Sequence, residues 1–166
     1  ELYCIKPPTV NLPSYVHPIP MSYYTPWSGI EHLEVAKRYG FRDLTHEWIR
    51  EGNIENFDQI DTTGWLMDLW LKFPKFGYAR ATDLACRWIR EGRITRDEAV
   101  RLVNKHDPIL DQKVLDDFLS FTGYSVMEFW DIVEKFWNRE IFEKVGEVWR
   151  KKEECELKLM TNTTSQ

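Results

Sequence analysis

Residues 79–106 read ARATDLACRWIREGRITRDEAVRLVNKH, and this stretch decides the fold class. Apolar residues recur at three- and four-residue spacing over 79–91, which predicts a helix that ends at Gly92. Thr95 and Glu98 stand three residues apart, the spacing of a capping box, and predict the start of a second helix. Two consecutive helices joined by a short turn indicate a helical protein.

Helical periodicity continues on both sides of this pair. Ser28 is a candidate N-cap, Pro74 a candidate helix stop, and Ser125 with Glu128 repeats the capping-box spacing. The predicted helices span 28–39, 43–50, 63–73, 79–91, 95–105, 108–123, 125–136 and 139–154. Few stretches alternate with a period of two. The sequence therefore predicts a mainly α protein, built as a compact multi-helix domain.

The first 28 residues have a different composition. They contain Pro7, Pro8, Pro13, Pro18, Pro20 and Pro26. Proline lacks a backbone donor and fixes φ, so no long helix is expected there. Tyrosines and Trp27 are interspersed, which is unusual for a disordered linker. We expect an extended N-terminal arm over 1–28, a helical domain over 29–154 and a frayed tail over 155–166.

Charge and cysteine content exclude several classes of protein. The 166 residues carry 22 basic and 27 acidic side chains, so generic binding to nucleic acid or to anionic membranes is not expected. Three scattered cysteines and four isolated histidines offer neither a disulfide framework nor a metal site. No apolar run approaches the ~18 residues of a membrane span, and no signal peptide is recognisable. A cytoplasmic location is the expectation.

A short internal echo links two parts of the chain. WIREGNI at 48–54 recurs as WIREGRI at 88–94. Repeat proteins generally need at least three copies. We therefore interpret the echo as two helices that use the same C-terminal stop signal, with glycine after a charged last turn.

Two segments carry the candidate site residues. In 75–86, Arg80 and Asp83 fall on one face of the predicted helix, where Asp83 is expected to pair with Arg80 and Arg87. Exposed ion pairs of this kind contribute about 0–1 kcal/mol each and need no function. The alternative is that Arg80 and Asp83 face a polar ligand from the start of a helix.

The second segment is the loop 51–61, which is rich in acids and amides. It can be a plain surface loop, with Asp61 or Thr62 capping the next helix. It can also place Asp58, Gln59 and Asp61 in a cleft.

Together these segments resemble a known family. The blocks EGNIENFDQIDTTGW (51–65), KFGYARATDLACRWIREGRITRDEAVRLVNKHD (75–107) and FLSFTGYSVMEFWDIVEKFWN (118–138) are similar to the C-terminal third of the N-acetyl sugar amidotransferases. These enzymes belong to the PP-loop ATP pyrophosphatases. The resemblance covers roughly 20–145, and YYTPWS and VAKRYGFRD fit the same region.

The resemblance implies an ATP-dependent reaction. Family members activate the amide oxygen of an N-acetyl group on a nucleotide-linked sugar, and ammonia from a partner glutaminase replaces that oxygen to leave an acetamidino group. The products enter bacterial surface polysaccharide, including lipopolysaccharide, or glycans of the pseudaminic- and legionaminic-acid type. No Ser-Gly-Gly-x-Asp-Ser loop occurs here, so ATP and magnesium are expected to bind a missing N-terminal domain.

The resemblance also implies substrate-binding roles. Arg80, Thr82 and Asp83 match the family's motif, although Leu84 stands where family members often carry histidine. Lys75, Asp58 and Asp61 are further candidates for substrate contact. No catalytic acid or base is identified. The alternative hypothesis is a non-catalytic helical module that docks the glutaminase or a second copy in a homodimer.

Overall fold

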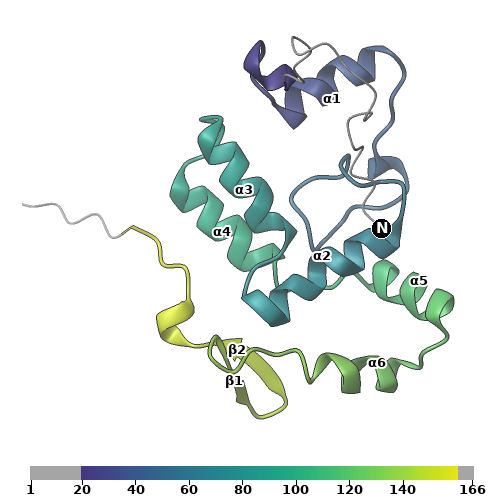
Figure 1. Ribbon diagram of the computed structural model, residues 1–166, viewed down its shortest axis with the longest axis vertical. Helices are drawn as coiled ribbons and strands as arrows, with labels where there is room; N and C mark the ends of the chain where they lie inside the picture. Colours follow the sequence, from purple (N-terminus) through teal and green to yellow (C-terminus); the bar gives the residue numbers. More distant parts are fainter. Residues whose placement is uncertain (1–19, 161–166) are drawn as a thin grey trace, which may run out of the picture. The chain divides into compact units, whose positions relative to one another are not determined.

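The computed structural model describes residues 20–160 (Figure 1). The chain divides into two compact units, residues 1–39 and residues 40–166. The first contains η1 (Met21–Tyr23) and α1 (Gly29–Arg38). The second contains η2 (Leu44–His46), α2 (Thr63–Phe76), α3 (Arg80–Arg90), α4 (Arg96–His106), α5 (Gln112–Thr122), α6 (Val126–Val133), β1 (Phe142–Val145), β2 (Val148–Lys151) and η3 (Glu153–Cys155). The protein is mainly helical, as the sequence predicts.

In the first unit, the start of α1 agrees with the sequence. The Ser28 hydroxyl accepts a hydrogen bond from the backbone N–H of Glu31, as expected of an N-cap. Of the predicted extended arm, residues 1–19 lie outside the described residues. The part that is described contains the single 3₁₀ turn η1, which follows Pro20.

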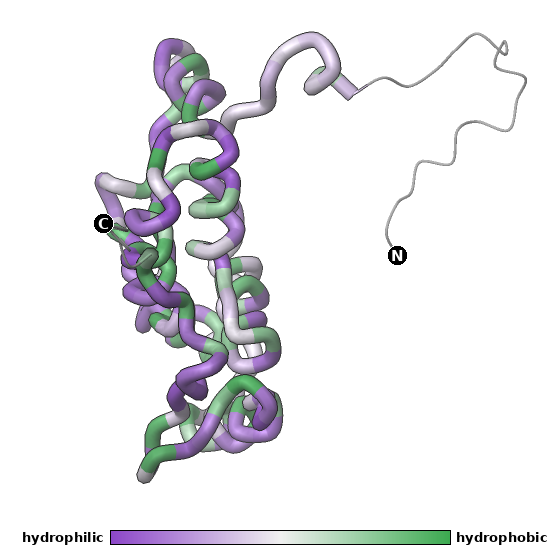
Figure 2. Tube along the Cα trace, turned by 90° about the vertical axis from the view of Figure 1, so that its left-hand side faces the viewer, coloured by the Kyte–Doolittle hydropathy of each residue, from purple (hydrophilic) through white to green (hydrophobic). Residues whose placement is uncertain are grey.

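In the second unit, α2, α5 and α6 pack around one apolar cluster. Met67 and Trp70 of α2 meet Val114 of α5 and Phe129 of α6, and all four side chains are at least nine-tenths buried. Figure 2 shows apolar residues recurring between polar ones along the helices, as expected for elements that bury one face.

Helices α3 and α4 pack against each other beside the loop 51–61. Ala85 of α3 packs on Ala99 and Val103 of α4, and small residues at this contact let the two backbones approach closely. The Thr95–Glu98 capping box is present at the start of α4, which confirms that prediction. Gly92 has a φ of 69° directly after α3, as its predicted place in the turn requires.

Helix α2 continues past Pro74, so the prediction that it stops at Phe73 is wrong. Proline in the last turn removes only one N–H donor, and the helix runs on to Phe76 before Gly77 ends it in the left-handed conformation. The terminal carbonyls have other partners: Asn138 donates its backbone N–H to the Pro74 oxygen (2.9 Å) and its side-chain N–H to the Lys75 oxygen (3.3 Å).

The helix predicted over 139–154 is also wrong, because this segment forms the antiparallel hairpin β1–β2. Val145 pairs with Val148, leaving Gly146 and Glu147 as the turn, and Gly146 has a φ of 63°. Glycine at the first position of a two-residue turn is typical of hairpins. Phe142 is 2 % exposed and packs in a cluster with Phe73.

Three other predicted boundaries differ. The helix predicted over 43–50 is only the short η2, because Asn56 takes the hydrogen bonds that would extend it. Helix α5 begins at Gln112 rather than Pro108, and α6 ends at Val133 rather than Phe136. No helix between residues 20 and 160 has the length and apolar character needed to cross a bilayer.

Candidate functional site

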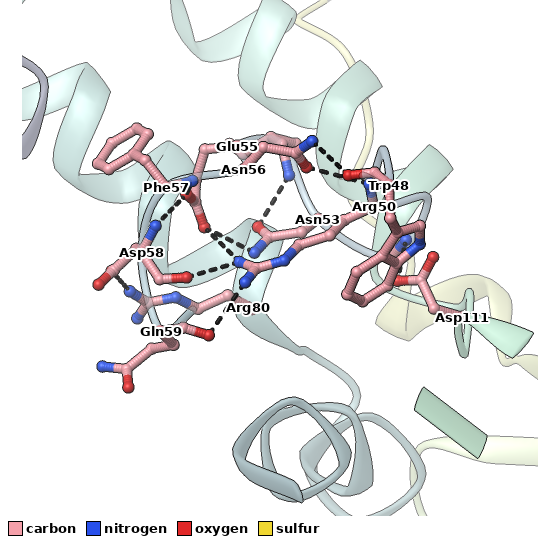
Figure 3. A network of polar contacts seen from close by, with 12 residues as sticks. Trp48, Arg50, Asn53, Glu55, Asn56, Phe57, Asp58, Gln59, Arg80 and Asp111 are labelled. Atoms are coloured by element: carbon pink, nitrogen blue, oxygen red, sulfur yellow. Dashed lines mark hydrogen bonds and ion pairs between the residues drawn. The ribbon is translucent and has the colours of Figure 1, made fainter. Parts of the chain in front are cut away.

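The loop 51–61 is built around the buried guanidinium of Arg50 (Figure 3). The Arg50 side chain is 1 % exposed and donates hydrogen bonds to the backbone oxygens of Asp58 (2.6 Å) and Gln59 (3.0 Å). Gln59 is the one non-glycine residue in 20–160 with a positive φ, 51°. A left-handed φ costs a non-glycine residue about 1 kcal/mol or more, and here it accompanies a carbonyl bound to Arg50.

Glu55 supplies the opposite charge. Its carboxylate, 2 % exposed, lies 3.4 Å from Arg50 and accepts hydrogen bonds from the N–H groups of Phe57 and Asp58 (both 2.6 Å). Burial raises the pKa of Glu55 above its ordinary value, and these N–H donors and Arg50 offset only part of that rise. Every group that contacts the carboxyl oxygens is a hydrogen-bond donor, so each contact suits the carboxylate form.

Asp111 fixes the same loop to the connection between α4 and α5. Its two carboxylate oxygens accept hydrogen bonds from the backbone N–H groups of Glu51 (2.7 Å) and Gly52 (3.0 Å). His106 also contacts the Glu51 oxygen at 2.6 Å. A Cβ atom on Gly52 would collide with the backbone oxygen of Ile109, so this position needs glycine.

Arg80 and Asp58 meet at the accessible edge of this network. They form an ion pair between the first residue of α3 and the loop, with side chains 14 % and 29 % exposed. The Nε atoms of Arg80 and Arg50 are buried, and no group in the described part of the chain, residues 20–160, accepts a hydrogen bond from them. Both arginines line a cavity of about 20 Å³, room for roughly one water molecule. Two of the residues that the sequence singled out as candidates for substrate contact, Arg80 and Asp58, are therefore brought together.

Thr82 and Asp83, the other motif residues, face different partners. Thr82 donates its hydroxyl hydrogen to the buried carboxylate of Asp107 (2.6 Å), which also accepts the Thr82 backbone N–H (3.2 Å). Asp107 thus satisfies a donor at the start of α3, where the N-cap residue Ala79 has no side-chain acceptor. Asp83 pairs with Lys72 of α2 at 2.6 Å, instead of with the predicted Arg80 and Arg87.

Within residues 20–160, no hydrogen bond or ion pair joins Lys75 or Asp61 to the Arg80–Asp58 pair. Lys75 lines a second cavity of about 220 Å³ together with Lys72, Phe76 and Phe136, and its Nζ lies 5.3 Å from the Phe76 ring centroid. Asp61 is exposed at the end of the loop. The next residue, Thr62, caps α2 by accepting from the Gly64 N–H, as the simpler interpretation of the loop expected.

Sequence reasoning missed the residues that organise the loop. The sequence pattern predicts that Arg50 belongs to a helix stop signal shared with Arg90, yet Arg50 is buried in a loop and Arg90 is exposed on α3. The interpretation of the echo is therefore wrong for its first copy. The acid- and amide-rich composition was the only signal that could have pointed to Glu55 and Asn56. Among residues 20–160 no group of three His, Cys, Asp or Glu side chains is arranged to hold a metal ion.

The observed class is a helical module with a polar loop fixed beside the start of α3. Residues 51–155 match a family model described as "LPS biosynthesis protein WbpG-like, C-terminal domain". The match begins with the loop and includes α2 to α6 and the hairpin, and it covers more than half of the chain. The chain belongs to this family of lipopolysaccharide biosynthesis proteins. No curated protein matches the chain.

Proposed function

We propose that this chain is the C-terminal part of an ATP-dependent N-acetyl sugar amidotransferase acting in lipopolysaccharide biosynthesis. Membership of the WbpG-like family supports the pathway, and the blocks that resemble sugar amidotransferases overlap the family match. In the proposed reaction the N-acetyl oxygen of a nucleotide-linked sugar is first adenylated, because an amide oxygen is a poor leaving group. Ammonia from a glutaminase then displaces it and leaves an acetamidino group.

The Arg80–Asp58 pair is the observation that carries the proposal for this chain. It combines a guanidinium donor with a carboxylate acceptor, and both remain partly open to solvent. An arginine can bind a phosphate or carbonyl oxygen of the substrate, and a carboxylate can accept from a sugar hydroxyl. Asp83, Lys75 and Asp61 are secondary candidates for substrate contact. Thr82 acts through Asp107 and positions the start of α3.

The remaining parts of the machinery lie with other components in this proposal. ATP and magnesium bind a separate N-terminal PP-loop domain, and ammonia comes from a glutaminase partner. The reaction takes place in the cytoplasm, where ATP and nucleotide-linked sugars are available.

Arg80→Ala in the full-length enzyme tests the proposal. Losing a charge-assisted contact of about 1.5–3 kcal/mol should lower sugar-nucleotide turnover by about tenfold to a hundredfold. The Arg80–Asp58 pair is partly exposed, so Tm should fall by no more than about 4 °C. Arg90→Ala, on the exposed side of the same helix, is the matched control and should leave turnover unchanged. Equal turnover in Arg80→Ala would remove Arg80 from the substrate site.

A docking module is the second candidate, and exposed apolar side chains favour it. Phe121 is 91 % and Met127 73 % exposed, with Tyr124 and Val126 between them also exposed at the corner from α5 to α6. Clustered exposed apolar side chains are typical of protein-binding surfaces. This corner would contact the glutaminase or a second copy of the chain.

A further inference from the structure

A groove outside the loop network lies between α4, the end of α2 and the hairpin. It has a volume of about 370 Å³, within the range of roughly 300–1,000 Å³ for small-molecule sites. Phe73, Val103 and Phe142 form its apolar wall, and Arg150, Lys151 and Asn104 supply polar groups. None of these residues belongs to the Arg80–Asp58 site.

The segment after the hairpin lies along α4 beside this groove and is held there by hydrogen bonds. Asn104 donates to the Leu157 oxygen (3.2 Å), and Arg96 donates to the Lys158 oxygen (3.0 Å). Further along, the Met160 N–H donates to Asp97 (2.9 Å). Glu156 belongs to this segment and lines the groove, so the segment forms one edge of the groove.

The Lys151 ammonium lies over the apolar wall of this groove. It lies 5.4 Å from the Phe73 ring centroid, and no carboxylate within residues 20–160 forms an ion pair with it. Asp107, Cys155 and Glu156 are its nearest acidic groups, but burial outweighs them and lowers the pKa of Lys151. Asp107 is also bound to Thr82. The hydration that this ammonium loses is therefore incompletely replaced, and an anion in the groove would replace it.

We propose that this groove binds a phosphorylated ring compound, with its phosphate at Lys151 and its ring against the apolar wall. This inference rests on the proposed function only for the choice of ligands, a nucleoside diphosphate or a sugar phosphate. The Lys151 ammonium and the adjoining apolar surface recognise the two halves of such a molecule. Glu156, at the rim, disfavours ligands that place their charge on that side.

Calorimetric titration of the 166-residue chain tests the site with four probes. Uridine diphosphate and N-acetylglucosamine 1-phosphate separate the two sources of a phosphorylated ring, and uridine and inorganic phosphate separate the ring from the anion. We expect saturable binding of at least one phosphorylated probe, and at least tenfold weaker binding of uridine and of phosphate. Lys151→Met should weaken binding by about tenfold or more. The matched control Lys135→Met removes an exposed lysine outside the groove and should bind as the wild type does.

Measuring Tm separates the loss of a ligand contact from a change in the packing of the protein. Because burial disfavours the Lys151 charge in the folded protein, Lys151→Met should raise Tm while it lowers affinity. Absence of saturable binding by the folded wild type, or wild-type affinity in the Lys151→Met variant, would overturn the inference. Turnover in the Arg80→Ala enzyme does not enter this measurement, so the two proposals can fail separately.

Discussion

At the residue scale, Arg50 and Gly52 determine the conformation of the loop. Arg50 binds two backbone carbonyls and Glu55 from inside it. Gly52 lies against the chain between α4 and α5 so closely that its missing side chain is a requirement. Neither contact is visible in the local sequence pattern, because Arg50 and Arg90 sit in nearly the same heptapeptide. The two arginines differ in the segments of the protein that pack against them.

Gly52→Ala should destabilise the protein. The added methyl group meets the backbone oxygen of Ile109, which cannot move without shifting the start of α5. Overpacking of this kind costs about 1–3 kcal/mol, or roughly 3–10 °C in Tm. Gly64→Ala is the control, since a Cβ atom there makes only an ordinary 3.5 Å contact within the first turn of α2. Thermal unfolding followed by circular dichroism compares the two; an equal Tm for both variants would contradict the steric argument.

At the scale of elements, the sequence predicted the elements whose signals are local. Both capping boxes formed, and Gly77, Gly92 and Gly123 all have positive φ just after helices. The hairpin was missed because Ile141, Val145 and Val148 are spaced as on a helix face. Its stability depends on packing distant in sequence, such as Phe142 on Phe73 and the stacking of Trp149 on Trp137 at 5.5 Å.

The hairpin should loosen at acid pH through Glu134. Hydrogen bonds from the Trp149 indole and the Lys144 ammonium, both 2.9 Å, lower the pKa of Glu134 below its ordinary 4.5. A depressed carboxyl pKa stabilises the fold above the unfolded-state value, and that contribution is lost as pH falls through the folded-state value. We therefore expect wild-type Tm to fall more than that of Glu134→Gln when pH is lowered below about 5.

Comparison with the variant isolates this carboxyl. Glu98 and Glu128, in the capping boxes, also have lowered pKa values, because they accept hydrogen bonds from Thr95 and Ser125. Both groups are present in the wild type and in Glu134→Gln, so their effects on Tm cancel when the two proteins are compared at each pH. Parallel Tm curves for the wild type and Glu134→Gln would show that Glu134 does not stabilise the hairpin.

At the scale of the whole molecule, three apolar clusters hold together the described part of the second unit, residues 40–160. Helix α2 contributes to two of them, Met67 and Trp70 to one and Phe73 to another. The third joins α3 and α4 beneath the loop residue Ile54. The sequence predicted the helical class and placed Arg80 and Asp58 in one candidate site. It did not predict the pair of Asp83 with Lys72 or the place of Lys75 beside Phe136, since these contacts join different elements.

The exposed corner between α5 and α6 allows a test of self-association. If it joins two copies of the chain, Phe121→Asp should shift the sedimentation coefficient from dimer to monomer at equal protein concentration. Ser120→Asp adds the same charge at the neighbouring exposed position of α5 and is the control. A wild-type chain that sediments as a monomer at all concentrations would exclude the homodimer and leave the glutaminase as the partner to examine.

The internal bonding of the loop has a consequence for affinity. Arg50, Glu55 and Asp111 fix residues 51–59 through contacts that need no ligand. Freezing a flexible segment costs roughly 1–2 kcal/mol per residue in backbone entropy. Here folding has already met that cost, so a molecule that reaches Asp58 encounters a preorganised surface and retains more of its interaction energy as affinity.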